Sequence, residues 1–284
     1  MNLALHHLLA PRIAALAIAL ATLSSAVRGA EPNSAANPAV EKPAAGIVSK
    51  EIMEKLKLPG LFINLEERAV DVDASICLDS GMLELIACTK NSKEHEAIFA
   101  VEAKAMHIHT ALLLLRAKPG NPAMQKQVGG EDGHWVQIPP RGGEVAVYLV
   151  FKNSEGKMVE HPINDFISRA ADAGADSDDA KTPDAEAIKF PTHKFLFAGS
   201  QLIGDGPGPK QYLSDQSGNV ISIVTFGDEL LCLPDVQAQD NASLIWEVNS
   251  ENLPPVGTKV ILRMRPVLDP AAKTAPVAPT LSKP

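Results

Sequence analysis

The residues best suited to chemistry gather in one short stretch of the chain. Lys93, His95 and Glu96 are close together in sequence, and His107 and His109 follow at the head of an apolar run. Imidazole nitrogens and carboxylate oxygens are the ligands that zinc and similar divalent ions bind in proteins. The same groups transfer protons, so His95 can act as a general base that a carboxylate orients. The stretch therefore indicates a metal site or an acid–base site.

Helical geometry restricts which of these histidines can act together. On a helix His107 and His109 point about 200° apart, so only one of them can join His95 in a site. Glu84 is a further carboxylate that can ligate a metal or orient His95. The zinc-protease pattern H-E-x-x-H is not met, because Phe99 occupies the position of the second histidine.

A purely structural interpretation of the same residues is equally open. On an extended segment His95 and Glu96 point to opposite faces, so they converge only at a turn or a bulge. The run from Lys93 to Glu96 is also typical of the polar start of a strand. His109 can be a hydrogen-bonded histidine where a helix enters the core.

Short β-strands dominate the pattern around this stretch. Alternating polar and apolar residues, or brief apolar runs between turn residues, are typical of strands. They predict strands at residues 61–65, 69–78, 82–89, 98–103, 145–152, 194–198, 211–214, 220–226, 243–248 and 259–264. Asp79, Ser80 and Gly81 predict a tight hairpin between the second and third of these strands.

One helix is predicted over residues 106–117. Ile108, Ala111, Leu112 and Leu115 recur there at the spacing of a buried helix face. Shorter helices are predicted at 50–56 and 163–171. Together these elements predict an α+β fold, in which mostly antiparallel strands form a sheet and the helix at 106–117 packs on it.

The chain has three cysteines, Cys77, Cys88 and Cys232. No C-x-x-C motif occurs, so the pattern predicts neither a zinc ribbon, an iron–sulfur cluster nor a thioredoxin-type dithiol. Simple pairing around the turn at 79–81 puts Cys77 opposite Leu83, which favours buried thiols. A disulfide between Cys77 and Cys88 is the alternative.

Residues 1–26 have the parts of a secretory signal peptide. Arg12 precedes an almost wholly apolar run at 13–23, and small residues follow at 24–26. The run is too short for a comfortable membrane span, which needs about 20 residues. We expect cleavage after Ala26, with Ala30 as the alternative, and a secreted or periplasmic protein.

Composition divides the rest of the chain. Residues 27–46 and 267–284 hold few bulky apolar side chains and predict a disordered linker and a disordered tail. Residues 47–266 then form a single globular domain, with an acidic surface insertion at 170–187. No other apolar segment approaches the length of a membrane helix, so no transmembrane segment is expected after signal cleavage.

The formal net charge of −8, without a stripe of Lys and Arg, argues against a nucleic-acid partner.

Four runs of residues form a recognisable pattern: 81–84, 93–96, 109–113 and 118–120. Residues 197–200, Tyr212, 215–218 and 231–234 extend it through the second half. This pattern resembles the YdjY-domain proteins over most of residues 60–265.

The resemblance extends over a whole domain. It implies almost nothing about activity, because the family is largely uncharacterised. It singles out His109 rather than His107 as the histidine of the pattern. Some relatives carry ferredoxin-like cysteine clusters, and this sequence has none, so no iron–sulfur cofactor is expected.

Two functional hypotheses follow. The first is a non-enzymatic domain that binds a protein or small-molecule ligand through the region from Lys93 to His109. The second is a metal-dependent hydrolase-like enzyme that uses His95, Glu96 and His109. In both, Glu84 and Lys93 support the central residues.

Overall fold

The computed structural model describes residues 56, 58–129, 133–170, 189–204, 206–238 and 244–268. All of these belong to one compact unit, Pro43–Pro284. The predicted signal peptide and linker lie outside the described residues. So do the helix at 50–56, the acidic insertion and the C-terminal tail, apart from a few residues at their edges.

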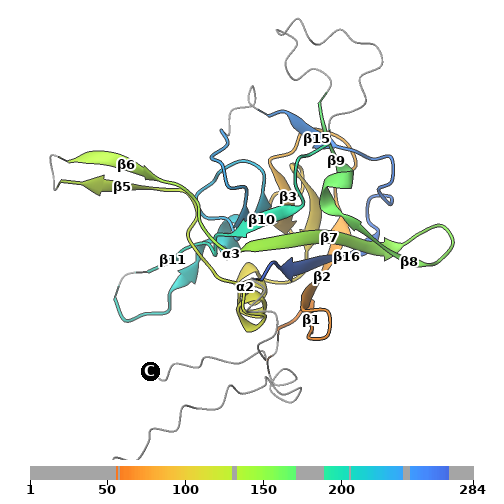
Figure 1. Cartoon of the computed structure of the whole chain (residues 1–284), viewed down its shortest axis with the longest axis horizontal. Helices are drawn as coiled ribbons and strands as arrows, with labels where there is room; N and C mark the ends of the chain where they lie inside the picture. The colour runs from red at the N-terminus through yellow and green to blue at the C-terminus, as the bar shows by residue number, and fades with distance from the viewer. Residues whose placement is uncertain are drawn as a thin grey trace, which may run out of the picture. The chain divides into compact units, whose positions relative to one another are not determined.

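Eight strands of the described region close into a barrel (Figure 1). Each strand hydrogen-bonds to the next, and the last strand pairs with the first, so the ring is complete. In order around the barrel they are β2 (Ala69–Ile76), β16 (Lys259–Pro266), β7 (Glu144–Lys152), β10 (Lys194–Phe197), β14 (Leu231–Cys232), β13 (Asn219–Ser222), β3 (Leu85–Thr89) and β4 (Ala97–Val101).

The core fills the inside of this barrel. Successive side chains of a strand point to opposite faces, so every second residue of the long strands turns inward. The inward residues of β2 and β16 are apolar and buried: Val70, Val72, Ala74, Ile76, Val260, Leu262 and Met264.

The predicted α+β class was wrong. Strands hold 42% of the described residues and helical residues 10%, and the two α-helices there are α2 (Ala105–Leu114) and α3 (Leu213–Ser217). α2 packs beside β1, β2 and α3, and its buried face joins the core of the barrel. A closed barrel surrounds its own core, so no broad open sheet face needs a helix to cover it.

The hairpin predicted at residues 79–81 was also wrong. β2 and β3 are not paired with each other, because β4 lies between them. β4 is antiparallel to β2, with Ile76 opposite Phe99, and parallel to β3, with Leu85 opposite Ala97. The segment between β2 and β3 therefore crosses one end of β4, and β3 and β4 begin at the same end of the barrel.

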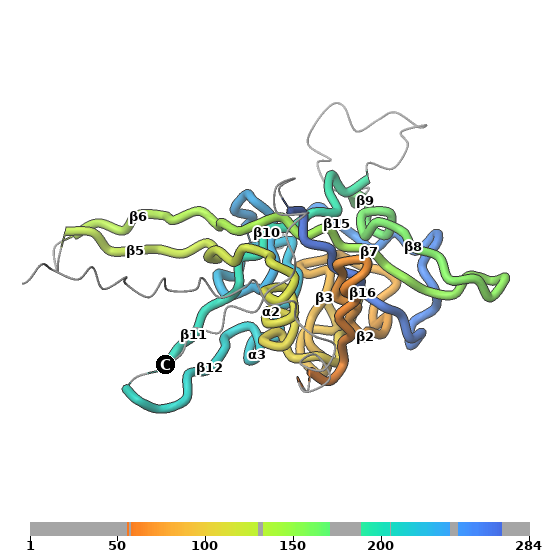
Figure 2. Tube along the Cα trace, turned by 60° about the horizontal axis from the view of Figure 1, so that its bottom comes forward, coloured from red at the N-terminus to blue at the C-terminus, as the bar shows by residue number. Residues whose placement is uncertain are grey.

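The remaining strands lie outside the barrel. The exposed hairpin of β5 and β6 extends away from it (Figure 2) and presents Val128, Trp135 and Val136 to solvent. These outer strands are β1 (Leu61–Asn64) on β2, β8 (Met158–Pro162) on β7, and the pairs β5 (Met124–Val128) with β6 (His134–Ile138), β11 (Leu202–Ile203) with β12 (Gln211–Tyr212), and β9 (Ile167–Arg169) with β15 (Trp246–Val248).

Two further local predictions failed where pairing with distant segments decides the backbone. The helix predicted at 163–171 is one 3₁₀ turn, η1 (Ile163–Phe166), followed by β9, whose partner β15 is far away in sequence. The strand predicted at 211–214 ends after two residues, where α3 begins. Among the described residues, no helix is long and apolar enough to cross a membrane.

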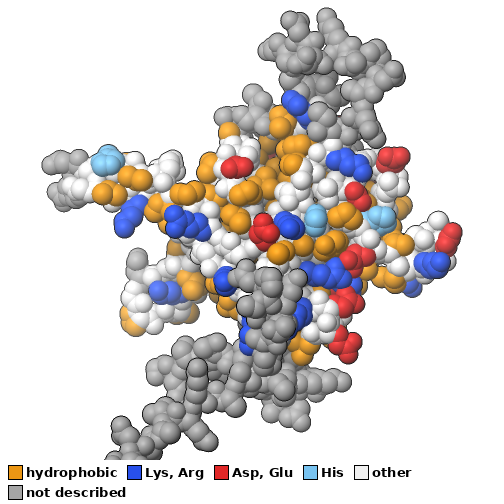
Figure 3. Space-filling model, in the orientation of Figure 1, with side chains coloured by type: hydrophobic (Ala, Val, Ile, Leu, Met, Phe, Trp, Pro, Cys, Tyr) orange, Lys and Arg blue, Asp and Glu red, His pale blue; other side chains and the backbone are white. Residues whose placement is uncertain are grey.

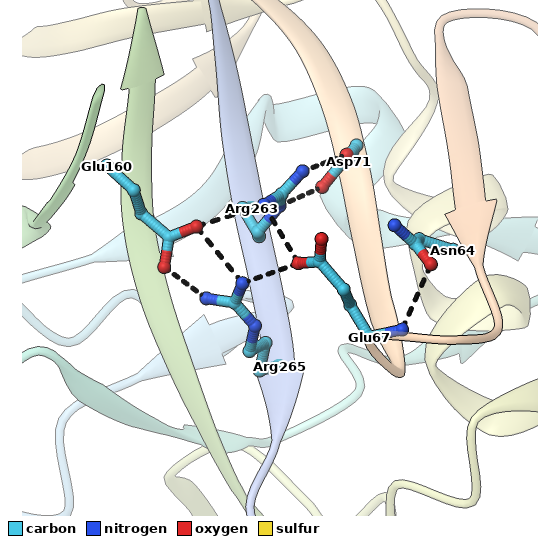
Figure 4. A network of polar contacts seen from close by, with 6 residues as sticks. All are labelled: Asn64, Glu67, Asp71, Glu160, Arg263 and Arg265. Carbon is cyan, nitrogen blue, oxygen red and sulfur yellow. Dashed lines mark hydrogen bonds and ion pairs between the residues drawn. The ribbon is translucent and has the colours of Figure 1, made fainter. Parts of the chain in front are cut away.

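A network of ion pairs joins three strands on the outer face (Figure 4). Arg263 of β16 binds Asp71 of β2 through two hydrogen bonds of 2.6 and 2.7 Å. Arg263 also contacts Glu67 and Glu160, and so does Arg265. Arg265 holds the pKa of Glu160 below its ordinary value of 4.5. Figure 3 shows side chains of both charges intermingled over these strands.

Candidate functional site

Four of the five predicted site residues meet at the start of β3 and β4. The backbone N–H groups of Glu84 and Leu85 both donate to the carbonyl of Glu96, at 3.2 and 3.1 Å. The carbonyl of Glu84 accepts from Ile223 and Val224, at 2.9 and 3.1 Å. Glu84 is thus fixed by the backbone on two sides. We call Glu84, Lys93, His95 and Glu96 the carboxylate cluster.

The carboxylate cluster forms because residues 93–96 make a turn. The backbone N–H of Glu96 donates to the carbonyl of Lys93 at 3.2 Å. This turn lets His95 and Glu96 converge, which an extended segment would not allow. Nε2 of His95 lies 3.7 Å from Oε2 of Glu96, and Nζ of Lys93 lies 3.3 Å from its Oε1. Glu96 therefore stands at the centre of the cluster.

The members of the cluster differ widely in exposure. The side chain of Glu96 is 19% exposed and that of Lys93 is 26% exposed, whereas His95 is 78% exposed. Nζ of Lys93 lies 3.7 Å from the ring centroid of Phe226, so the ammonium is seated on an aromatic face. The carboxyls of Glu84 and Glu96 and the ammonium of Lys93 are therefore partly buried, and the imidazole of His95 is exposed to solvent.

The carboxyl of Glu84 lies beside that of Glu96, and this changes the ionisation of Glu84. Burial raises the pKa of Glu84 above its ordinary 4.5, and the neighbouring charge of Glu96 and a hydrogen bond between the two carboxyls raise it further. Lys93 and His95 act in the opposite direction. Such a pair can hold a shared proton or exchange it for a bound cation.

His109 lies in a different environment, on α2. Its Nδ1 is 2.8 Å from the hydroxyl of Tyr212, and that hydroxyl donates to the carbonyl of Gly199 at 2.9 Å. The hydroxyl therefore accepts from Nδ1, which carries the proton of the neutral ring. The ring of Phe197 meets His109 edge to face at 4.8 Å. Burial lowers the pKa of His109 below 6.5, and a hydrogen bond that the ring donates to the backbone of Gly199 opposes this shift.

β4 separates His109 from the carboxylate cluster. The cluster stands before the first residue of this strand, and α2 follows its last residue. The five residues of β4, at about 3.3 Å each, span on the order of 16 Å, and the two groups lie beyond opposite ends of this strand. His95, Glu96 and His109 were predicted to act together. The structure brings His95 and Glu96 together and places His109 beside Tyr212. Within the described part of the chain, no three His, Cys, Asp or Glu side chains are grouped to hold a metal ion.

Two groups of residues, around Lys93 and around His109, could not be identified from the sequence. Phe226, which seats Lys93, is more than a hundred residues away from it in the chain. Around His109, Gly199 and Ser200 both have positive φ, of 81° and 54°. A Cβ at Gly199 would lie 3.1 Å from Cε1 of His109, so glycine leaves room for the imidazole. No spacing motif in the sequence predicts the positive φ values of Gly199 and Ser200.

One protein-family model matches this chain. A family model described as the YdjY domain matches residues 61–265, which run from the first residue of β1 into β16. Because the match covers most of the chain, this protein belongs to the YdjY-domain family, whose function is unknown. Searches of curated proteins and of solved structures find no match.

Proposed function

We propose that this protein is a secreted or periplasmic, non-enzymatic binding domain, and that its carboxylate cluster engages a cationic group of a ligand or partner. The observation that carries the proposal is the pairing of Glu84 with Glu96, whose backbone groups are hydrogen-bonded at 3.2 Å and of which Glu96 contacts Lys93. Burial, and then the charge of Glu96, raises the pKa of Glu84. Ionising both carboxyls costs free energy that a bound ammonium or guanidinium group recovers.

The backbone holds Glu84 and Glu96 together, so the free-energy cost of ionising both carboxyls remains. Glu84 and Glu96 are held side by side by the ladder between β3 and β4, so the two charges cannot separate by a shift of the main chain. Lys93 contacts Glu96 and leaves one carboxylate of the pair in excess. A site whose charge and geometry exist before the ligand arrives loses little ordering entropy on binding.

The arrangement of His95 and His109 favours binding over catalysis. A general base needs a fixed orientation and a position within hydrogen-bonding reach of its proton. His95 is 78% exposed, and its Nε2 lies 3.7 Å from Glu96, beyond a hydrogen bond. His109 is held by Tyr212, away from the cluster. A hydrolase built on all three predicted residues would need them in one place.

The proposed location outside the cytoplasm is supported by the signal-peptide pattern of residues 1–26. N-terminal sequencing of the protein from its native cells tests it, with a new N-terminus at Val27 expected. A protein that keeps Met1 and sediments with the membrane would contradict the proposed location without affecting the binding proposal.

The binding proposal is tested with an array of short peptides rich in Lys and Arg. The test variant is Glu84→Gln/Glu96→Gln, and the control is Glu155→Gln/Glu251→Gln, which removes two charges at exposed positions. We expect the test variant to bind the best cationic peptide at least tenfold more weakly and the control to match the parent protein. Equal binding by both variants would exclude the cluster as the site.

The same assay separates this proposal from the metal-site hypothesis. Binding of the cationic peptide is expected to be unchanged by EDTA, because the proposed contacts are ion pairs with Glu84 and Glu96. A loss of binding with EDTA that zinc restores would overturn the proposal in favour of a metal ligated by His95 and Glu96. Parent protein that binds none of the cationic peptides would also contradict it.

A further inference from the structure

The hairpin of β5 and β6 has two unpaired edges. Within the described part of the chain, these strands pair only with each other, in a sheet of two strands. Four of the five residues in each strand are exposed, and the hairpin extends away from the barrel in both views (Figures 1 and 2). A two-stranded hairpin in water is marginally stable, whereas a sheet of three or more strands holds together. A further strand on one edge would therefore stabilise it.

The side chains of this hairpin divide between two faces. Lys126 lies opposite Val136, and Gln127 lies opposite Trp135. Residues that lie opposite each other in an antiparallel pair point to the same face. Lys126, Val128 and Val136 therefore share one face. Trp135, which is 64% exposed, lies on the other face and has apolar surface that a neighbouring strand could cover.

The two edges of the hairpin differ in charge. β5 carries Lys126 at its centre, and a lysine on an edge strand discourages pairing. β6 contains no Lys, Arg, Asp or Glu. Each copy of the chain has a formal net charge of −8, so two copies repel each other unless they meet at a neutral surface. The edge of β6 is such a surface, and it ends at Ile138 because Pro139 and Pro140 have no N–H to donate.

β6 is complementary to a second copy of itself. When two β6 strands pair antiparallel over their full length about a two-fold axis, Val136 lies opposite Val136 of the other copy. Trp135 then lies opposite Gln137. The same pairing of two β5 strands would set Lys126 opposite Lys126, and like charges directly opposite each other destabilise a sheet. Self-pairing therefore favours β6.

The charges next to β6 in the sequence favour the same arrangement. The start of β6 follows Glu131 and Asp132, and its end precedes Arg141. In an antiparallel pair, the start of each strand lies beside the end of the other. The acidic side of one β6 is thus brought to the basic side of the second.

We propose that β6 pairs with β6 of a second copy of this chain, so that two hairpins form one sheet in the order β5, β6, β6, β5. The contact uses the same edge in both copies, so it closes with two molecules. Its small size makes the dimer weak. The inference does not rest on the proposed binding function.

Sedimentation equilibrium of the purified protein tests the dimer, over about 1 to 300 μM because a small interface is weak. Val136→Lys sets two ammonium groups opposite each other at the axis, so the dissociation constant should rise about tenfold or more. Val128→Lys is the control, because Val128 is exposed to a similar extent, 44% against 39% for Val136, and lies on the same face of β5. It should dimerise like the parent. A parent protein that is monomeric at every concentration, or equal dimerisation of the two variants, would overturn the proposal.

Cross-linking tests the register. Residues that lie opposite each other in an antiparallel pair have Cα atoms about 4.5–5.5 Å apart, within reach of a disulfide. After mild oxidation, Val136→Cys should give two copies joined through the tryptic peptide 127–141, which contains no natural cysteine. Val128→Cys should remain unlinked. Equal linking of the two variants, or no link in Val136→Cys, would contradict pairing through β6.

Discussion

Two acidic regions of this barrel contain similar side chains, yet the pKa of a glutamate is lowered in one region and raised in the other. Around β16, the acids Glu67, Asp71 and Glu160 meet two arginines, and in the carboxylate cluster two glutamates meet Lys93. Each region thus has one carboxylate more than its cations. The pKa of Glu160 is nevertheless lowered and that of Glu84 raised.

Burial is the largest cause of the raised pKa of Glu84, whereas hydrogen bonds from arginine outweigh burial at Glu160. The geometry of the cations explains why. A guanidinium group has five donors in a planar fork, so Arg263 can bind Asp71 with two bonds and still reach Glu67 and Glu160. The ammonium of Lys93 is a point charge that contacts one oxygen of Glu96. The first region satisfies its carboxylates within the protein. The second has one ammonium for two carboxyl groups.

The largest effect should come from breaking the satisfied region. Arg263→Met removes the two-bond partner of Asp71, whose side chain is only 12% exposed, and leaves that carboxylate without its main counter-ion. We expect the free energy of unfolding to fall by roughly 3 kcal/mol, measured by urea denaturation. Arg265→Met is the control, with a smaller loss expected. Equal and small losses would show that the network is only a surface feature.

Neutralising one acid in each region should change stability with opposite signs. At pH 7, Glu160→Gln should cost about 1 kcal/mol because its ion pairs are lost. Glu84→Gln should stabilise the protein by about 0.5 kcal/mol, because a neutral amide removes the cost of burying a charge and the repulsion from Glu96.

The pH dependence of these two variants checks the signs. Glu160 has a lowered pKa, so its contribution is present above the ordinary 4.5 and is lost as the pH falls. Glu84 has a raised pKa, so its penalty appears only as the pH rises above 4.5. Denaturation curves from pH 4 to pH 7 should therefore show both variants approaching the parent at the acid end. Stability changes of the same sign in both variants at pH 7 would contradict the proposed difference between the two regions.

The smallest effect should come from the aromatic seat of Lys93. Phe226→Leu removes the ring under the ammonium, which is worth about 0.5 kcal/mol at a partly exposed position. With Lys93 less firmly held, the pKa of Glu84 should rise further, as carbon NMR of its carboxyl group can record. Phe62→Leu, at an exposed ring of β1, is the matched control and should leave that pKa unchanged.

The sequence predicted best what depends on residues close together in the chain. The strands at 61–65, 145–152 and 194–198 match β1, β7 and β10 within one residue, and α2 begins one residue before its prediction. The meeting of His95 with Glu96 needs only the turn at 93–96. The YdjY-domain resemblance, which rests on several runs of residues, was confirmed over residues 61–265.

What failed depends on pairing between distant segments. Alternation shows that residues 69–78 and 82–89 can be strands and does not show that β4 will lie between them. The same pairing decides that Glu84 meets Glu96 and that His109 lies beyond the far end of β4. The α+β class was wrong for this reason too, since closure by β4 and β2 turns a sheet into a barrel.

The position of β16 determines when this domain can assemble. β16 is the last strand of the described residues, yet it lies between β2, the first strand of the barrel, and β7. A chain that lacks residues after 258 would have two unpaired strand edges, which are templates for aggregation. Folding must therefore await nearly the whole chain, and its contacts of long sequence separation should make it slow.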